Sequence, residues 1–117
     1  MHEFGLCEGI VDAIQQRAAG RPVARVRVRV GVLHRVVADA FQHAFAHAAS
    51  GTEAEDATVD LVLLPVQAVC RTCQAEVECD DALVVCPQCG GVDLDLTGGD
   101  ELILEWIEYQ DPAARSR

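Results

Sequence analysis

The chain has 117 residues and a formal net charge of −10, carried by 19 acidic residues against nine arginines and no lysine. Its length predicts one domain, or one domain with a small insert. The acidic balance repels a phosphate backbone, which disfavours nucleic acid as the main partner. No stretch approaches about 18 consecutive apolar residues, and the first residues lack the pattern of a signal peptide. We therefore expect a cytoplasmic protein without a membrane span.

The first third of the chain predicts a helix followed by a strand. Residues 5–19 carry apolar side chains at three- and four-residue spacing, and Gly20 follows them as a stop signal. Within residues 23–30, Arg and Val then alternate strictly, which is the pattern of a half-buried strand. We expect the Val row to face a core and the Arg row to form a solvated face of the sheet, paired with Glu on a neighbouring strand.

Residues 36–49 predict a second helix, which Gly51 ends. Its apolar residues gather on one side, and a polar stripe with i, i+4 and i+8 spacing lies opposite. Such a stripe could hold a metal ion, but we favour a solvated polar face. The apolar side holds Val37, Phe41, Ala44, Phe45 and Ala48, and the polar stripe holds Asp39, His43 and His47.

Three further apolar runs occupy the second half of the chain. Residues 59–69 predict one central strand, and residues 92–97 and 101–109 predict a hairpin around a Gly-rich turn. These elements together predict an α+β fold. In this fold, two helices pack on a small three-stranded sheet that carries an inserted zinc-ribbon-like domain with four cysteines.

We assign residues 70–91 to the inserted zinc-binding domain. Residues 1–69 and 92–117 then form the α+β domain. The boundaries follow the abrupt change of composition at the first cysteine of the insert and after the last.

Two CxxC pairs, Cys70/Cys73 and Cys86/Cys89, lie in the insert. In a reducing compartment such cysteines bind metals more often than they form disulfides. Four thiolates in two tight turns can close a tetrahedral shell around zinc, and four protein ligands leave no open position for hydrolytic chemistry. The spacing therefore predicts a structural zinc site. Two disulfides, or a single iron, are the alternatives.

The other two cysteines, Cys7 and Cys79, are expected to be unliganded thiols. Cys7 has one additional feature, because it is a soft potential ligand within reach of His2.

The chain begins Met1-His2-Glu3, before the first predicted helix. The α-amine of Met1, the backbone amide and imidazole of His2, and the carboxylate of Glu3 are adjacent groups. Nitrogen donors placed in this way can chelate a metal, and square-planar nitrogen sets suit Ni(II) or Cu(II). A frayed terminus without function is the plainer interpretation of these three residues alone.

Several motifs occur in a fixed order along the chain: MHE at 1–3, LCE at 6–8, Val30-Gly31, the two CxxC pairs and TGGDEL at 97–102. In this combination the sequence resembles the hydrogenase nickel-incorporation metallochaperones of the HypA/HybF family, over nearly the whole chain. The resemblance implies a nickel-binding domain with an inserted zinc domain.

The resemblance also implies a nickel site. In that family the N-terminal His binds nickel with nearby backbone nitrogen, which transfers to His2, and the adjacent Glu is implicated, which transfers to Glu3. Some members use an acidic residue at the start of the second helix, which here is Asp39. Many members have a Pro-Glu pair shortly after the position of Gly31, and this sequence lacks it. His34 could take its place as a ligand in that stretch, although we favour a plain surface histidine.

As a function, the resemblance implies a metallochaperone that delivers nickel during maturation of nickel–iron hydrogenase. Zinc is then a structural cofactor and nickel a transient cargo. The implied partners are a GTPase accessory protein and the hydrogenase large subunit. Related proteins serve hydrogenase and sometimes urease, and the sequence leaves the recipient open, as it does the oligomeric state, a homodimer included.

We expect no enzyme, because the sequence has no Ser/His/Asp grouping and no phosphate-binding glycine loop. Two other functions stay open from the residues alone. One is a zinc-ribbon module that docks proteins without delivering nickel. The other is an iron redox protein similar to rubredoxin.

Overall fold

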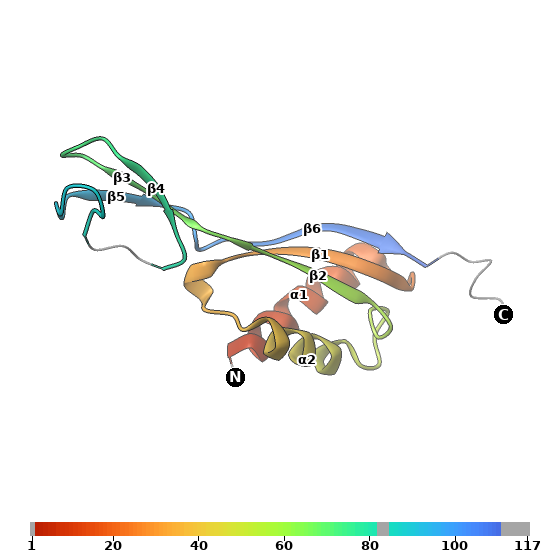
Figure 1. The fold of residues 1–117 in the computed structure, drawn as a ribbon. Helices are drawn as coiled ribbons and strands as arrows, with labels where there is room; N and C mark the ends of the chain where they lie inside the picture. The colour runs from red at the N-terminus through yellow and green to blue at the C-terminus, as the bar shows by residue number, and fades with distance from the viewer. Residues whose placement is uncertain (1, 82–84, 111–117) are drawn as a thin grey trace. The chain divides into compact units, whose positions relative to one another are not determined.

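A computed structural model describes residues 2–81 and 85–110 of the chain. No helix in this part is long and apolar enough to cross a membrane. Figure 1 shows the order of the elements. They are helix α1 (His2–Ala18), strand β1 (Val23–Gly31), the short 3-10 helix η1 (Val32–His34), helix α2 (Ala38–Ala49), and strands β2 (Thr58–Leu64), β3 (Val66–Cys70), β4 (Glu76–Cys79), β5 (Leu94–Thr97) and β6 (Leu102–Tyr109).

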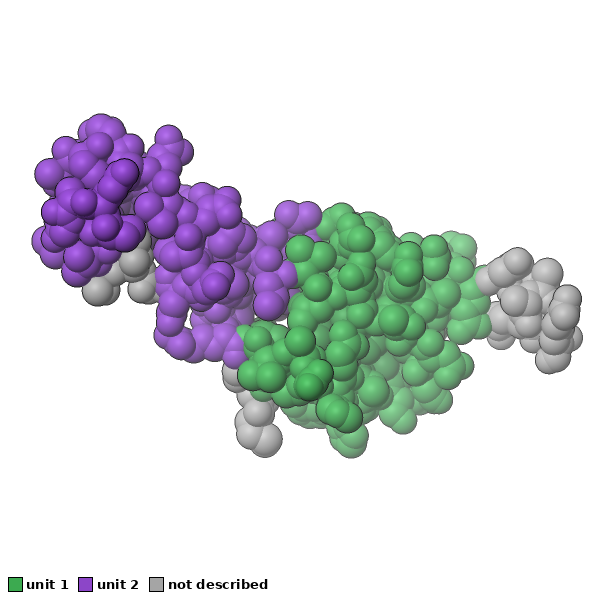
Figure 2. All heavy atoms as spheres, viewed as in Figure 1, with its two compact units in different colours: residues 1–28, 36–62, 103–117 green, residues 29–35, 63–102 purple. Residues whose placement is uncertain are grey.

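The chain divides into two compact units, coloured separately in Figure 2. The first, here called the helical unit, comprises residues 1–28, 36–62 and 103–117. The second, here called the cysteine unit, comprises residues 29–35 and 63–102. Compactness does not show that a unit folds alone, so the domain boundaries given above stay a prediction.

The helical unit packs α1 and α2 with a sheet whose strand order is β2-β1-β6. Val26 and Val28 of β1 are fully buried, as the alternation predicts. The intervening Arg27 binds acidic residues on both neighbouring strands, at 2.8 Å from Asp60 of β2 and 3.9 Å from Glu105 of β6. The expected pairing of the Arg row with neighbouring strands is thereby confirmed for this residue.

Helix α2 buries Phe41 and Phe45 as predicted, together with Ala49. The prediction for Val37 is wrong, since its side chain is 61% exposed. Val37 is the residue that precedes the helix, and its extended backbone (φ −94°, ψ 123°) turns the side chain away from the apolar side. The polar stripe of α2 is exposed at Asp39, His43 and His47, as expected for a solvated face.

The cysteine unit contains the second sheet, with strand order β4-β3-β5 and both pairs antiparallel. Ala68 of β3 pairs with Val77 on one side and with Leu96 on the other. Val66, Ala68 and Cys70 point to the buried side of this sheet.

Two predictions for the second half of the chain are wrong. The expected strand over 59–69 is two strands, because Pro65, which has no backbone N–H to donate, separates β2 from β3. The expected hairpin does not form, since β5 pairs with β3 whereas β6 belongs to the other sheet. Gly98 and Gly99, with φ of +74° and +85°, turn the chain between the two sheets instead of folding it back on itself.

Candidate metal centre

The four cysteines of the two CxxC pairs come together in the cysteine unit. Their sulfur atoms all lie within 4.8 Å of one another. The Sγ of Cys70 is 3.6 Å from that of Cys89, and the Sγ of Cys73 is 3.7 Å from that of Cys86. No other group of potential ligands of this kind occurs among the described residues.

This sulfur arrangement fits a tetrahedral metal ion. A zinc–sulfur bond of about 2.3 Å in a regular tetrahedron requires sulfur atoms about 3.8 Å apart. The two facing pairs are close to that separation, and all six cysteines of the chain are free thiols. The geometry therefore favours a metal site over the alternative of two disulfides.

Both CxxC pairs use the same backbone turn. In the first, the N–H of Gln74 donates to the carbonyl of Cys70 (2.8 Å), and in the second the N–H of Gly90 donates to the carbonyl of Cys86 (2.9 Å). Gln74 and Gly90 both have positive φ, of +68° and +76°. The repeated turn aims both sulfurs of each pair at one point, which is what the two-residue gap of a CxxC pair permits.

The backbone also places N–H groups against the sulfurs. The N–H of Cys73 contributes most to lowering the pKa of Cys70, to about 6. For Cys89 the Gly91 N–H lowers the pKa, but the hydrogen bond with the Cys70 thiol and burial outweigh it and raise the pKa to about 12. One thiol of this facing pair thus ionises readily, and a cation held by the four cysteines would favour loss of the proton from the other thiol.

The other facing pair, Cys73 and Cys86, also has one thiol with a lowered pKa and one with a raised pKa. The N–H groups of Cys89 and Gln88 lower the pKa of Cys86. The pKa of Cys73 is raised, because burial and the hydrogen bond with Cys86 outweigh the effect of the Ala75 N–H.

At the other candidate site, helix α1 begins at His2, about one turn earlier than predicted. Glu3 therefore lies in the helix, and its side chain is 7% exposed, the one buried charged side chain in the part that the structure describes. Its Oε2 accepts a hydrogen bond from the backbone N–H of Val37 (3.3 Å). Met1 and the side chain of His2 lie outside the described residues.

Asp39 lies two residues after Val37, in the first turn of α2, and is exposed. The structure thus brings Glu3 to the start of the helix that carries Asp39, and Figure 1 shows these two helix ends side by side. Nothing in the sequence pattern indicates the contact with Val37, because it uses a backbone group.

Cys7 lies one helical turn after Glu3 and is completely buried. Its thiol donates to the carbonyl of Phe41 (3.6 Å). Burial, and secondarily the charge of Glu3, raise the pKa of Cys7 to about 11. Cys79 is half-exposed and donates to the carbonyl of Val66 (3.6 Å). Neither thiol belongs to the four-cysteine cluster.

The comparisons with known proteins agree with this geometry. A family model described as "Hydrogenase/urease nickel incorporation, metallochaperone, hypA" matches residues 1–109. The chain belongs to the HypA family. The resemblance stated from the motifs is thereby confirmed.

Among the relatives in this family, the hydrogenase maturation factor HypA 2 of Bradyrhizobium diazoefficiens is 37% identical over 111 residues, which cover 92% of this chain and 98% of the relative. The hydrogenase maturation factor HypA of Rhodobacter capsulatus is 40% identical over 111 residues, with the same coverage of 92% and 98%.

The solution structure of the Ni metallochaperone HypA from Helicobacter pylori matches with a TM-score of 0.61 at 23% identity, and the match covers 92% of this chain and 96% of the other. At that identity the match establishes a shared fold. The predicted α+β class with a four-cysteine cluster is therefore confirmed.

The TGGDEL motif that this chain carries at 97–102 is a structural loop of the cysteine unit. The carbonyl of Gly99 accepts the N–H of Leu33 (2.8 Å), and the Nε2–H of His34 donates to the carbonyl of Asp100 (2.9 Å). His34, the alternative nickel ligand, is thus engaged with this loop.

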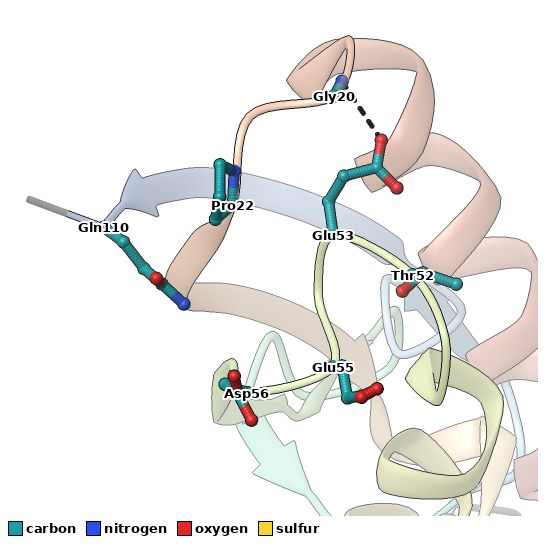
Figure 3. Close-up of a pocket in the computed structure, with 7 residues that line it drawn as sticks. All are labelled: Gly20, Pro22, Thr52, Glu53, Glu55, Asp56 and Gln110. Atoms are coloured by element: carbon teal, nitrogen blue, oxygen red, sulfur yellow. Dashed lines mark hydrogen bonds between the residues drawn. The ribbon is translucent and has the colours of Figure 1, made fainter. Parts of the chain in front are cut away.

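A pocket of about 250 Å³ opens in the helical unit, and Figure 3 shows its lining. Glu53, at its wall, accepts the N–H of Gly20 (3.1 Å), and its pKa is lowered by its own backbone N–H and then by Gln15. Gly20, which lines the pocket, follows the C-terminal end of α1. Because this helix has 17 residues and spans about 25 Å, the pocket lies at the opposite end of α1 from its first residue, His2. None of the predicted site residues lines this pocket.

The raised pKa of Cys7 leads to a labelling prediction. At pH 8, a pKa of about 11 instead of 9.0 lowers the thiolate fraction about 100-fold, and the thiolate is the reactive form. We expect an alkylating reagent to label Cys79 of the metal-loaded protein well before Cys7, with peptide mass spectrometry as the measurement. Equal labelling rates for the two would contradict the buried environment of Cys7.

Proposed function

We propose that this chain binds Ni(II) at its N-terminus and delivers it during maturation of a nickel–iron hydrogenase. The observation that carries the proposal is the match of the HypA family model from residue 1 to residue 109, which includes the chain start. The relatives in that family are named hydrogenase maturation factors.

The donors of the proposed nickel site are the α-amine of Met1 and the amide and imidazole of His2. Adjacent nitrogen donors of this kind satisfy the square-planar preference of Ni(II). Asp39 completes the proposed site from the first turn of α2, and Glu3 adjoins the site from the first turn of α1. A chelate formed at the end of a chain can be approached by an acceptor protein, as delivery of a cargo requires.

We further propose zinc as the resident metal of the four cysteines. Soft thiolates in a tetrahedral set without an open position are the donor set of structural zinc, and the sulfur separations of 3.6 and 3.7 Å support this choice. When bound, zinc holds the two CxxC turns together. The residues that would bind it are Cys70, Cys73, Cys86 and Cys89.

The proposed partners are a GTPase accessory protein and the hydrogenase large subunit, in the cytoplasm. GTP hydrolysis belongs to the partner, because this sequence has no phosphate-binding glycine loop. The family description also names urease, so a urease is the second candidate recipient. We propose residues 1–69 and 92–117 as the nickel-binding domain and residues 70–91 as the zinc-binding one.

Replacing His2 with Ala is expected to reduce nickel binding at least 100-fold while zinc content stays at one ion per chain. The reason is that the substitution removes the imidazole from a chelate in which the donors act together. Isothermal titration of the zinc-loaded, tag-free protein with Ni(II), together with metal analysis, measures both quantities.

His43→Ala is the matched control, because it removes an exposed histidine of α2 and should leave nickel affinity unchanged. A short N-terminal extension that blocks the α-amine should act like His2→Ala. A zinc-ribbon docking module, the alternative function, would not respond to a blocked amine. Stoichiometric nickel in the His2→Ala protein would refute the proposed site.

A further inference from the structure

The first two turns of α1 are attached to the start of α2 at two points in the helical unit. Glu3 Oε2 accepts the backbone N–H of Val37, and the Cys7 thiol donates to the backbone carbonyl of Phe41. Glu3 and Cys7 are four residues apart, as are Val37 and Phe41. Since residues at this spacing share one helix face, both attachments lie on the same side of α1.

The attachment at Glu3 uses the backbone N–H of Val37, which has no hydrogen-bond acceptor within α2. The first N–H groups of a helix have no partner within the helix, and Val37, the N-cap residue, offers no side-chain hydrogen bond. The Glu3 carboxylate supplies an acceptor there, and its negative charge suits the positive end of the α2 dipole. The Val37 side chain takes no part, since it is 61% exposed.

Burial of the carboxylate separates it from a role as ligand. Glu3 as a whole residue is only 7% exposed, so its carboxylate is stabilised by the protein groups around it and is largely removed from the solvent through which a cargo ion enters and leaves.

We propose that Glu3 is a positioning residue: its carboxylate binds the N-terminus of α2 instead of the nickel ion, and thereby holds the start of α1 next to the turn that carries Asp39. The proposal rests on the proposed function for its nickel readout. Cys7 is the second anchor of the same attachment.

Two substitutions at Glu3 separate the roles. In Glu3→Gln the amide oxygen can still accept the Val37 N–H, so nickel affinity should stay within about twofold of the parent protein. In Glu3→Ala the acceptor is gone, and we expect about tenfold weaker nickel binding. If the carboxylate were a ligand, Glu3→Gln would weaken binding as much as Glu3→Ala does, and this result would overturn the proposal.

Two substitutions at Val37 test the same bond from the other side. Val37→Pro removes the N–H without touching Glu3, whereas Val37→Ala keeps it and serves as the control. We expect Val37→Pro to weaken nickel binding about as much as Glu3→Ala, and Val37→Ala to leave it unchanged. Because both changes remove one bond, the double variant should bind nickel no more weakly than either single variant. Additive losses would overturn the proposal.

A readout that does not need nickel distinguishes failure of this inference from failure of the proposed function. Hydrogen exchange of the Val37 amide, measured by NMR on the zinc-loaded protein, should be slow in the parent and in Glu3→Gln and at least tenfold faster in Glu3→Ala. If the parent protein binds no nickel, the proposed function fails, while this exchange still decides the attachment. Equal exchange in all three proteins would overturn it.

Discussion

Replacing Cys70 with Ser is expected to abolish stoichiometric metal binding and to unfold the sheet β4-β3-β5. A structural zinc ion contributes on the order of 10 kcal/mol to the folding of a small domain, which equals or exceeds the whole stability of many proteins. A hydroxyl is a poor substitute for thiolate in a set of four soft ligands. Loss of the metal ion should therefore destabilise the whole cysteine unit.

The arrangement of this sheet explains the size of the expected effect. Cys70 is the last residue of β3, while β4 begins three residues after Cys73 and β5 begins five residues after Cys89. Each of the three strands is thus connected to a cysteine of the cluster within a few residues. Apart from Cys70 itself, the buried apolar side chains of this sheet are small, namely Val66 and Ala68. Such a core cannot stabilise three short strands by itself.

Metal analysis and the NMR spectrum of the variant measure the two parts of this prediction. Cys79→Ser is the matched control, since Cys79 lies in the same sheet, on β4, but outside the cluster. It should retain one metal ion per chain and the β3–β4 pairing. A Cys70→Ser protein that keeps both would show that three thiolates suffice, and that the sheet does not depend on the fourth.

The features that could be predicted from the sequence are those set by local spacing. Both CxxC turns close within five residues, so their geometry follows from the pattern itself, including the hydrogen bonds from Gln74 and Gly90. The Arg and Val alternation of β1 predicts its two faces in the same way, because side chains of a strand alternate whatever the strand pairs with.

Strand pairing was not predictable in this way. The apolar run over 59–69 carries no signal of which sheet each half joins, apart from Pro65. The Gly98-Gly99 pair matches a hairpin turn, yet it lies within van der Waals reach of Pro65, since a Cβ on Gly98 would be 3.6 Å from the Pro65 carbonyl. Pro65 and the Gly98-Gly99 turn are therefore neighbours. The strands next to them, β3 and β5, pair with each other in one sheet.

The start of the chain shows the same limit for the candidate site. Residues 1–3 match a frayed terminus as well as a chelate, and their sequence gives no sign of the contact of Glu3 with Val37, a residue 34 positions away. A backbone N–H carries no sequence signature. The contact that places Glu3 at the start of α2 could therefore not be predicted from the sequence and required the structure.

Replacing Gly31 with Ala is expected to destabilise the cysteine unit by about 3–5 kcal/mol. A Cβ at Gly31 would overlap the backbone carbonyl of Gly99, and backbone atoms cannot move aside as a flexible side chain does. Two hydrogen bonds of 2.8 Å maintain the close approach. The Gly31 N–H donates to the Glu101 carbonyl, and the Leu33 N–H donates to the Gly99 carbonyl. Overpacking costs about 1–3 kcal/mol, and each lost hydrogen bond adds about 1 kcal/mol.

Gly99 cannot yield to the new methyl group, because its own conformation is constrained. Its φ is +85°, and a Cβ there would clash with Val66 of β3. The strain from Gly31→Ala must therefore pass into the TGGDEL loop and β3, whose last residue is Cys70 of the four-cysteine cluster. We accordingly expect weaker zinc retention under chelator competition, in addition to a lower urea midpoint.

Gly9→Ala is the matched control for the glycine substitution. Gly9 lies inside α1, and a Cβ added at this residue would have nothing within 4 Å of it. The same chemical change should therefore stabilise the protein by about 0.5–1 kcal/mol through helix propensity. Urea unfolding of the zinc-loaded variants followed by circular dichroism measures both. If Gly31→Ala unfolds at the parent midpoint, the contact between Gly31 and Gly99 is looser than the structure describes, and the TGGDEL loop is not fastened through it.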